Sequence, residues 1–242
     1  IPFGIETKVE DTINQLMAGA LLVLNASNTA LVGGHTSEGA ELAVGFSVNG
    51  LIDKEKILRK GGMNPGDQLI LTKGLGTGTI FAADMQQKAR GRWVESAIQS
   101  MLSSNRVAAE IIFNHDATAC TDITGFGLLG HMVEMIKASE VDVELFLSSI
   151  PIINGALDTM AMGIFSSLQP ANIRLRRAIL NLNQVVESPI FPLIFDPQTS
   201  GGLLASIPEA TAQNCLKGLK GKGYVHSAII GTVVEKSENL EP

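Results

Sequence analysis

The sequence predicts an α/β protein of the α+β type with mixed sheets, in which a partial N-terminal domain precedes a larger C-terminal α/β domain. Three observations support this class. The 242 residues are 45% apolar and only 17% charged, as is typical of a globular protein with a sizeable core. Apolar residues recur with both the helical period and the two-residue period of strands. Helical and strand segments alternate along the chain without a repeat or a low-complexity tract.

The N-terminal part of the chain forms an incomplete block. An apolar helical stripe covers residues 10–26, and residues 29–33 and 42–48 are expected to be strands. One helix and two or three strands cannot bury both faces of a sheet, so partners from a segment not present here or from another subunit are expected. Because the chain opens with Ile1 and no initiator Met, we expect a fragment of a longer protein.

The domain boundaries follow from a change in composition. Residues 53–66 are charged and contain Gly-Gly and Pro-Gly pairs, which indicates a junction. Residues 1–52 would then belong to the N-terminal domain, 67–236 to the C-terminal domain and 237–242 to a tail.

Beyond the junction, strands and helices are interleaved. Strands are expected at residues 68–73, 117–120, 141–146, 193–195, 203–207 and 228–235. Helices are expected after Gly78 and at residues 93–102, 106–113, 128–136, 155–162, 173–182 and 209–220.

Charge and cysteine content restrict the function. A net charge of −6 without a basic stripe argues against nucleic acid as a partner. The one dense basic patch of the sequence, Arg174, Arg176 and Arg177, fits either an anion site or an ordinary helix surface. Cys120 and Cys215 are too few for a disulfide framework or a zinc cage, and we interpret them as core residues rather than nucleophiles.

The sequence carries no membrane or export signal. No apolar run reaches the roughly 18 to 20 residues that span a bilayer. The N-terminus lacks the basic region and apolar core of a signal peptide. A soluble, cytoplasmic protein is expected.

Four glycine-rich loops are the main candidates for a ligand site: residues 33–39, 74–78, 125–130 and 196–202. None fits the P-loop or the dinucleotide fingerprint, and each alone is a weak signal. Together they border strands and are rich in Ser, Thr, Asp and His, which favours a phosphate-bearing ligand held by backbone amides. His35 either donates to a phosphate oxygen or pairs with a backbone carbonyl.

The segment 121–131, TDITGFGLLGH, is the most informative of these motifs. It places Asp122 in a glycine-rich turn that leads into an apolar helix. Aspartate most often caps the helix at such a position. The alternative is that its carboxylate holds a hard cation that in turn binds phosphate. His131, on that helix, is expected to be a satisfied core or rim histidine.

Together, the motifs at residues 33–36, 66–78, 121–131 and 196–203 resemble those of selenophosphate synthetases, also called selenide, water dikinases. The third motif is highly specific to that family. The fourth is shared with a wider superfamily that includes aminoimidazole ribonucleotide synthetase. The resemblance covers nearly the whole chain. It implies N-terminal dimerisation domains that pair into a β-barrel-like homodimer, followed by a larger C-terminal α/β domain.

The reaction implied by this resemblance converts ATP, selenide and water into selenophosphate, AMP and phosphate, for selenocysteine and selenouridine biosynthesis. Asp122 matches the family's Mg²⁺-ligating aspartate. The loop that touches ATP in the family is matched by Gly33, Gly34, His35 and Thr36. Family members also carry a reactive Cys or selenocysteine, a Lys and further aspartates upstream, and none has a counterpart here. We therefore expect no catalytic residue in this chain and no activity from the chain alone.

Two other functions are compatible with the sequence. The first is another ATP-dependent enzyme of the superfamily, such as aminoimidazole ribonucleotide synthetase or thiamine-phosphate kinase. The second is a non-catalytic dimerisation or nucleotide-binding module. The expected partners are a second copy of the chain, ATP and selenide, with neither nucleic acid nor membrane.

Overall fold

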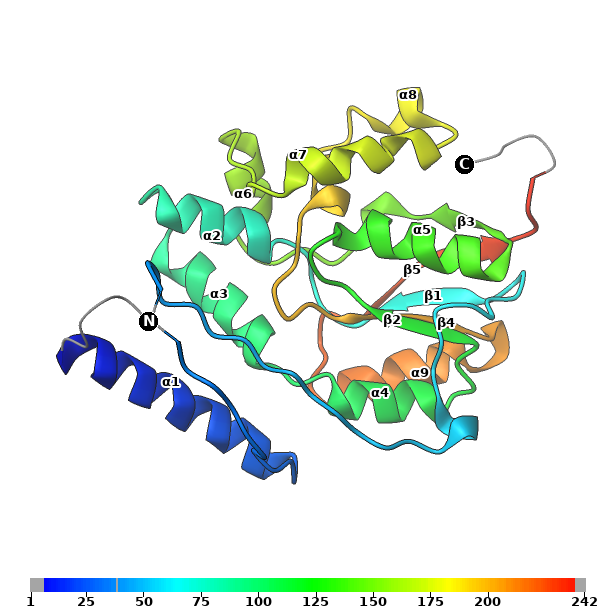
Figure 1. Cartoon of the computed structure of the whole chain (residues 1–242). Coiled ribbons are helices and arrows are strands. Elements are labelled where there is room, and N and C mark those ends of the chain that lie inside the picture. The colour runs from blue at the N-terminus through cyan, green and yellow to red at the C-terminus, as the bar shows by residue number, and fades with distance from the viewer. Residues whose placement is uncertain (1–6, 38, 238–242) are drawn as a thin grey trace. The chain divides into compact units, whose positions relative to one another are not determined.

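The computed structural model describes residues 7–37 and 39–237 and divides the chain into two compact units, residues 1–52 and 53–242 (Figure 1). Glu38 of the first glycine loop and residues 238–242 of the expected tail lie outside the described residues.

The first unit contains the helix α1 (Thr7–Ala26), and the residues described after it, 27–37 and 39–52, form no strand. The prediction of strands at residues 29–33 and 42–48 was therefore wrong. A strand requires ladder hydrogen bonds to a neighbour, and the described part of this unit offers only a helix whose backbone groups are already paired. The apolar side chains that should cover a sheet face are instead exposed, with Val32 at 94% and Val48 at 76%.

The second unit is built on a five-stranded sheet in the order β2-β4-β1-β5-β3, and each neighbouring pair is antiparallel. Its strands are β1 (Gln68–Leu71), β2 (Ala119–Asp122), β3 (Asp142–Leu145), β4 (Leu203–Ile207) and β5 (Ala228–Val234). In the register of the β2-β4 pair, Asp122 lies opposite Leu203. This sheet with its covering helices confirms the α+β class.

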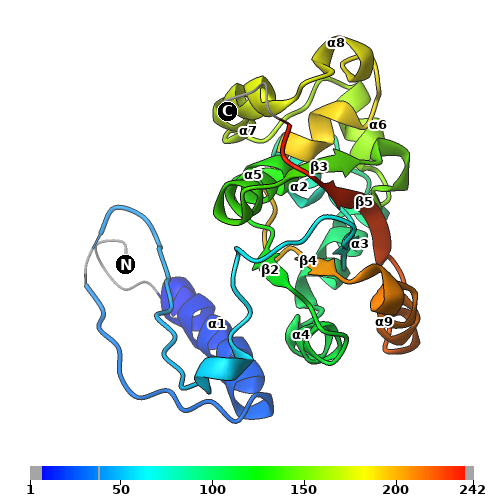
Figure 2. The ribbon, with the colours of Figure 1, turned by 90° about the vertical axis from the view of Figure 1, so that its right-hand side faces the viewer.

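Helices cover both faces of this sheet. The α-helices of the unit are α2 (Thr77–Met85), α3 (Gly91–Leu102), α4 (Arg106–Phe113), α5 (Gly127–Ser139), α6 (Ala156–Ala161), α7 (Gln169–Asn172), α8 (Leu182–Val185) and α9 (Glu209–Gly221). Helix α5 lies on one face, and α4 and α9 lie on the other (Figures 1 and 2). Within the described ranges, no helix is both long enough and apolar enough to span a bilayer.

Four short 3₁₀ helices complete the unit: η1 (Lys54–Lys56), η2 (Leu147–Ser149), η3 (Ile173–Ala178) and η4 (Phe191–Phe195). The last replaces the strand predicted at residues 193–195. Pro192 at its start lacks an N–H group and has a helical φ, which suits the first turn of a helix and not a central strand. An apolar run of this length does not distinguish the two by periodicity.

The helix predicted at residues 173–182 is also divided. The 3₁₀ helix η3 follows α7 directly and ends at Ile179, whose φ of −97° and ψ of 115° are extended. Leu182 then begins the separate helix α8. A 3₁₀ helix places every third residue on the same side, so Leu175 and Ala178 both pack against the core below α5.

Candidate functional site

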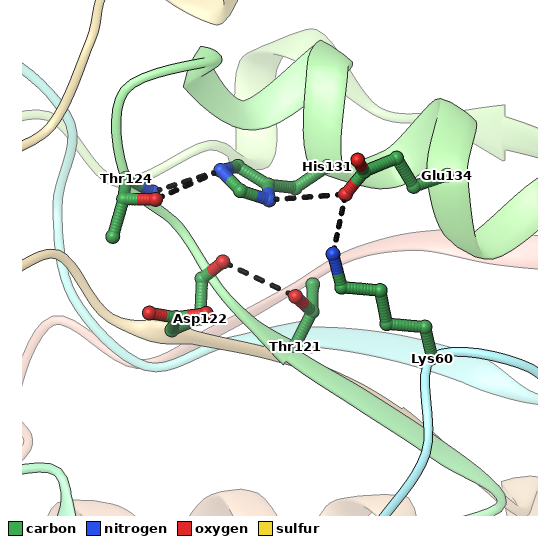
Figure 3. Close-up of polar contacts among 6 residues, drawn as sticks. All are labelled: Lys60, Thr121, Asp122, Thr124, His131 and Glu134. Carbon is green, nitrogen blue, oxygen red and sulfur yellow. Dashed lines mark hydrogen bonds and ion pairs between the residues drawn. The ribbon is translucent and has the colours of Figure 1, made fainter. Parts of the chain in front are cut away.

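Asp122 ends β2, an edge strand of the sheet, at the start of the loop that leads into α5. Its side chain is exposed, and the dashed line drawn at this residue in Figure 3 joins its main-chain oxygen to the hydroxyl of Thr121. The N-cap residue of α5 is Phe126, and no side chain caps this helix. The helix-cap interpretation of Asp122 was therefore wrong, and its carboxylate remains available to a ligand.

His131 holds the loop after Asp122 in place from the first turns of α5. Its Nε2 atom lies 3.1 Å from both the backbone nitrogen and the hydroxyl of Thr124 (Figure 3). A backbone N–H can only donate, so Nε2 is unprotonated and the ring proton is on Nδ1. That nitrogen faces Glu134 Oε2 at 3.5 Å, which is the outer limit for a hydrogen bond. His131 is therefore buried, as predicted, but only its Nε2 is satisfied, because Nδ1 has no hydrogen-bond partner among the described residues.

Burial lowers the pKa of His131, and this effect outweighs the opposing attraction of Glu134 and Asp122 for the proton. Lys60 donates a 2.6 Å hydrogen bond to Glu134 and holds the pKa of that carboxyl below its ordinary value. The contacts from Lys60 through Glu134 and His131 to Thr124 thus connect the segment before β1 to the loop that carries Asp122.

The three glycine loops of this unit interlock. A Cβ atom at Gly78 would collide with the carbonyl of Pro197, and one at Gly201 would collide with the carbonyl of Ile123. The backbone N–H of Gln198 donates to Thr124 O at 2.9 Å. The 196–202 loop therefore meets both the 74–78 loop and residues 123–124, just before the 125–130 loop, and glycine is needed where the backbones touch.

The start of α2 is capped by the fourth glycine motif. Gln198 Oε1 accepts hydrogen bonds from the backbone nitrogens of Gly76 at 3.0 Å and Thr77 at 3.2 Å. Its Nε2 donates to the carboxylate of Asp196 at 2.9 Å. These two amides are engaged by the chain itself, so the interpretation of residues 74–78 as a phosphate-binding loop is not supported in this structure.

Asp196 lies fully buried beside this helix start. Burial raises its pKa to about 7, although hydrogen bonds from Gln198 and from the backbone of Thr79 and Gly78 work in the opposite direction. Asp196 therefore titrates near neutral pH.

Lys73 is a buried cation that sequence reasoning missed. It directly follows Thr72 beyond the end of β1, and its Nζ donates to the carbonyls of Ser103 at 2.6 Å and Ser200 at 2.9 Å. Burial lowers its pKa to about 8. Within the described part of the chain it has no carboxylate partner. The available signal was a lysine two residues after the apolar end of the strand, Leu71.

The predicted ATP loop belongs to the first unit. Gly34, His35 and Thr36 are exposed, and a Cβ atom at Gly33 or Gly34 would meet nothing within 4 Å. Packing within the described residues therefore does not require glycine there. The carbonyl partner considered for His35 is not observed among the described residues.

The environments of the cysteines and of the acidic residues bear on two kinds of site, a reactive thiol and a metal-binding group. Cys120 and Cys215 are both buried free thiols, and burial raises their pKa values to about 12 and about 11. Such thiols stay protonated at neutral pH, which confirms them as core residues. In the ranges that the structure describes, no three His, Cys, Asp or Glu residues are grouped as they would be around a metal ion.

Comparisons with known proteins show which sequences this chain resembles. Residues 64–240 match the family model "AIR synthase related protein, C-terminal domain". The chain is 36% identical to a selenide, water dikinase of Clostridioides difficile over 94% of its own length and 66% of the relative's. It is also 36% identical to one of Pelobacter propionicus, over 98% of the chain and 68% of the relative.

Two solved structures share the fold at low sequence identity. Thiamine monophosphate kinase of Aquifex aeolicus is 16% identical with a TM-score of 0.60, covering 100% of this chain and 72% of the kinase. The hydrogenase maturation protein HypE in complex with ATP is 17% identical with a TM-score of 0.55. The match covers 76% of this chain and 47% of the HypE chain.

The chain thus spans about two thirds of the length of the relatives that it matches. The matching family model, the 36% identity and the TDITGFGLLGH motif at residues 121–131 agree with one another. On this evidence the chain belongs to the selenide, water dikinase family of the AIR synthase related proteins.

Proposed function

We propose that this chain is part of an enzyme that makes selenophosphate, AMP and phosphate from ATP, selenide and water. The observation that carries the proposal is that the carboxylate of Asp122 has no structural partner among the described residues. Its carboxylate is exposed and caps no helix, yet the loop beside it is fixed by the buried His131. A carboxylate held at a strand end without a structural partner is suited to a ligand.

We assign Asp122 as a ligand of Mg²⁺. Carboxylate oxygen is the donor that this cation prefers, and Mg²⁺ is usually held by one or two carboxylates together with substrate phosphates. When bound, the ion bridges phosphate oxygens and neutralises their charge. A single carboxylate would bind it weakly, which agrees with the absence of a three-ligand group among the residues that the structure describes.

We assign ATP binding to the first glycine loop, through Gly33, Gly34, His35 and Thr36. Their exposure leaves backbone amides, a hydroxyl and an imidazole available to phosphate oxygens. HypE, which shares the fold, has been solved with ATP. We also propose a homodimer, because large apolar side chains of the first unit are exposed, and a cytoplasmic location, because both cysteines are free thiols.

The test is Asp122→Asn in a version of the protein extended to the full length of its relatives. Replacing the carboxylate should lower Mg²⁺-dependent AMP formation at least a hundredfold, because an amide is a poor ligand for this cation. The fold should be preserved, because no described hydrogen bond ends on this carboxylate. Asp84→Asn, which changes an exposed aspartate on α2, is the matched control. Retained turnover in Asp122→Asn would reject the ligand assignment.

The shared fold supports a second candidate, a kinase acting on another substrate such as thiamine monophosphate. Assaying the extended protein with selenide and with thiamine monophosphate separates the two. A non-catalytic module is the third possibility. Calorimetric titration with ATP and Mg²⁺ tests it, because a purely structural module should release no heat of binding.

A further inference from the structure

The arginine patch of the sequence surrounds a hollow that the proposed function does not use. This arginine hollow has a volume of about 680 Å³ and is lined by Pro170, Ile173, Arg174, Arg176, Arg177 and Leu182. Pockets for small molecules typically measure about 300 to 1,000 Å³. The hollow is formed by α7, η3 and α8, which Figures 1 and 2 both show beside α5.

The 3₁₀ geometry of η3 explains why the arginines gather there. With three residues per turn, side chains three positions apart align in rows. Leu175 and Ala178 form one row that packs against the core, and Ile173, in the row of Arg176, also packs against it. Arg174 and Arg177 form a second row and are both exposed, so their guanidinium groups are on the same side of the helix. In an α-helix, the two would diverge by about 60° around the axis.

The three guanidinium groups have no ion-pair partner among the described residues. None of Arg174, Arg176 and Arg177 forms an ion pair or a hydrogen bond with a residue that the structure describes. By contrast, Arg106 on α4 pairs with Glu110. Three like charges within four residues repel one another, and an anion between them would remove that repulsion. This cluster occurs on a chain whose net charge is −6, so it is not a consequence of a generally basic surface.

We propose that the arginine hollow binds a small phosphorylated anion that carries at least two phosphate groups. Guanidinium groups bind phosphate oxygens through paired hydrogen bonds, and three of them can serve more than one phosphate. Pro170, Ile173 and Leu182 provide an apolar wall for the non-charged part of the ligand, so a nucleoside diphosphate should bind more tightly than pyrophosphate. The hollow is partly open to solvent, but its six lining residues form a local site of small-molecule volume, whereas nucleic acid binds along extended basic surfaces.

The hollow is also connected to the Asp122 loop. Asn172, which immediately precedes η3, is buried and donates from Nδ2 to Gly125 O at 2.9 Å and Phe195 O at 3.0 Å. A ligand that steadies η3 therefore steadies one anchor of the 123–126 loop. The proposal itself does not depend on the proposed function, because these residues are not part of the proposed Mg²⁺ or ATP sites.

The experiment is calorimetric titration of the 242-residue chain with pyrophosphate and with ADP in the presence of EDTA. Chelation removes the Mg²⁺ on which the proposed catalytic site depends, so binding that remains is independent of Asp122. The double variant Arg174→Gln/Arg177→Gln should weaken pyrophosphate binding roughly tenfold or more. The control Arg92→Gln/Arg106→Gln removes the same charge from α3 and α4 and should change the affinity less than about twofold.

Three results would overturn the proposal. The first is no pyrophosphate binding at concentrations up to about 10 mM. The second is equal weakening in both double variants, which would indicate only a general charge effect. The third is binding that survives Arg174→Gln/Arg177→Gln but is lost in His35→Ala, which would place the anion in the first glycine loop. Tight binding of a short RNA without pyrophosphate binding would point to a different class of partner and would equally reject a small-molecule site.

Discussion

At the residue scale, Asp196 is the carboxyl group whose environment differs most from water. It is fully buried, and its pKa of about 7 is well above that of an aspartate in an unfolded chain, near 3.9. Between these two values the folded protein retains a proton that the unfolded chain has released. The free energy of unfolding therefore falls as pH rises, by up to about 1.4 kcal/mol per pH unit.

Asp196→Asn removes this titration. From about pH 4 to about pH 7, the stability of the variant relative to the parent should increase by a few kcal/mol and then level off. Urea unfolding of both proteins across this range measures the difference. Asp84→Asn on the surface should show no such trend, and parallel pH profiles for Asp196→Asn and the parent would contradict the prediction.

His131 was correctly predicted to be buried, but the expectation that it would be satisfied was wrong for Nδ1, and its role required the structure. Its Nε2 atom accepts from Thr124 seven residues earlier in the chain, so it fixes the loop instead of binding a ligand. By contrast, Asp122 was expected to be either a cap or a ligand, and the structure removed the first alternative. Lys73 and the roles of Asp196 and Gln198 were not predicted, because each also has partners far away in sequence: Ser200 for Lys73, Gly76 for Gln198, and the backbone of Gly78 and Thr79 for Asp196.

At the element scale, α2 depends on a distant cap. Its N-cap residue is Gly76, which has no side chain, and Gln198 supplies the acceptor for the backbone N–H groups of Gly76 and Thr77. Gln198→Ala would leave these buried donors unpaired and should cost about 1 to 3 kcal/mol of stability.

Urea unfolding checks this prediction. Gln99→Ala, on the exposed side of α3, is the matched control and should cost less than about 0.5 kcal/mol. If Gln198→Ala lowered the free energy of unfolding no more than the control does, α2 would not need the cap.

Most regular elements of the second unit followed from local patterns. The predicted helices at residues 106–113 and 209–220 and the strand at 203–207 agree with α4, α9 and β4 within one residue. The errors at residues 173–182 and 193–195 have a common cause. Short apolar runs adopt whichever geometry buries them, and in the structure both runs pack against the core that includes α5.

At the scale of the whole molecule, the second unit has its own sheet and cores. Buried clusters lie on both faces of the sheet, and a third lies among α2, α3 and α6. A protein of residues 53–242 should therefore fold alone and unfold in one cooperative transition. Circular dichroism with thermal melting tests this expectation. A broad transition, or a helix signal far below that expected for α2 to α9, would contradict it.

The 242-residue chain should not form AMP from ATP and selenide. Asp122 is the one metal ligand that we assign within it, and a lone carboxylate is too weak a site to hold Mg²⁺ and ATP in alignment. Incubation of the purified chain with ATP, Mg²⁺ and selenide, followed by quantification of AMP, measures this directly. AMP formation above that of a protein-free reaction would show that the chain contains a complete site.

The sequence by itself determined the fold class, the family motif at residues 121–131 and the core identity of both cysteines, because these depend on composition, periodicity and local spacing. Only the tertiary structure decided that three glycine loops interlock, that Asp122 caps nothing and that Arg174 and Arg177 share one side of η3. The strands expected at residues 29–33 and 42–48 show the reason. A pattern specifies which residues can form an element, but backbone and side-chain partners distant in sequence determine whether and how it forms.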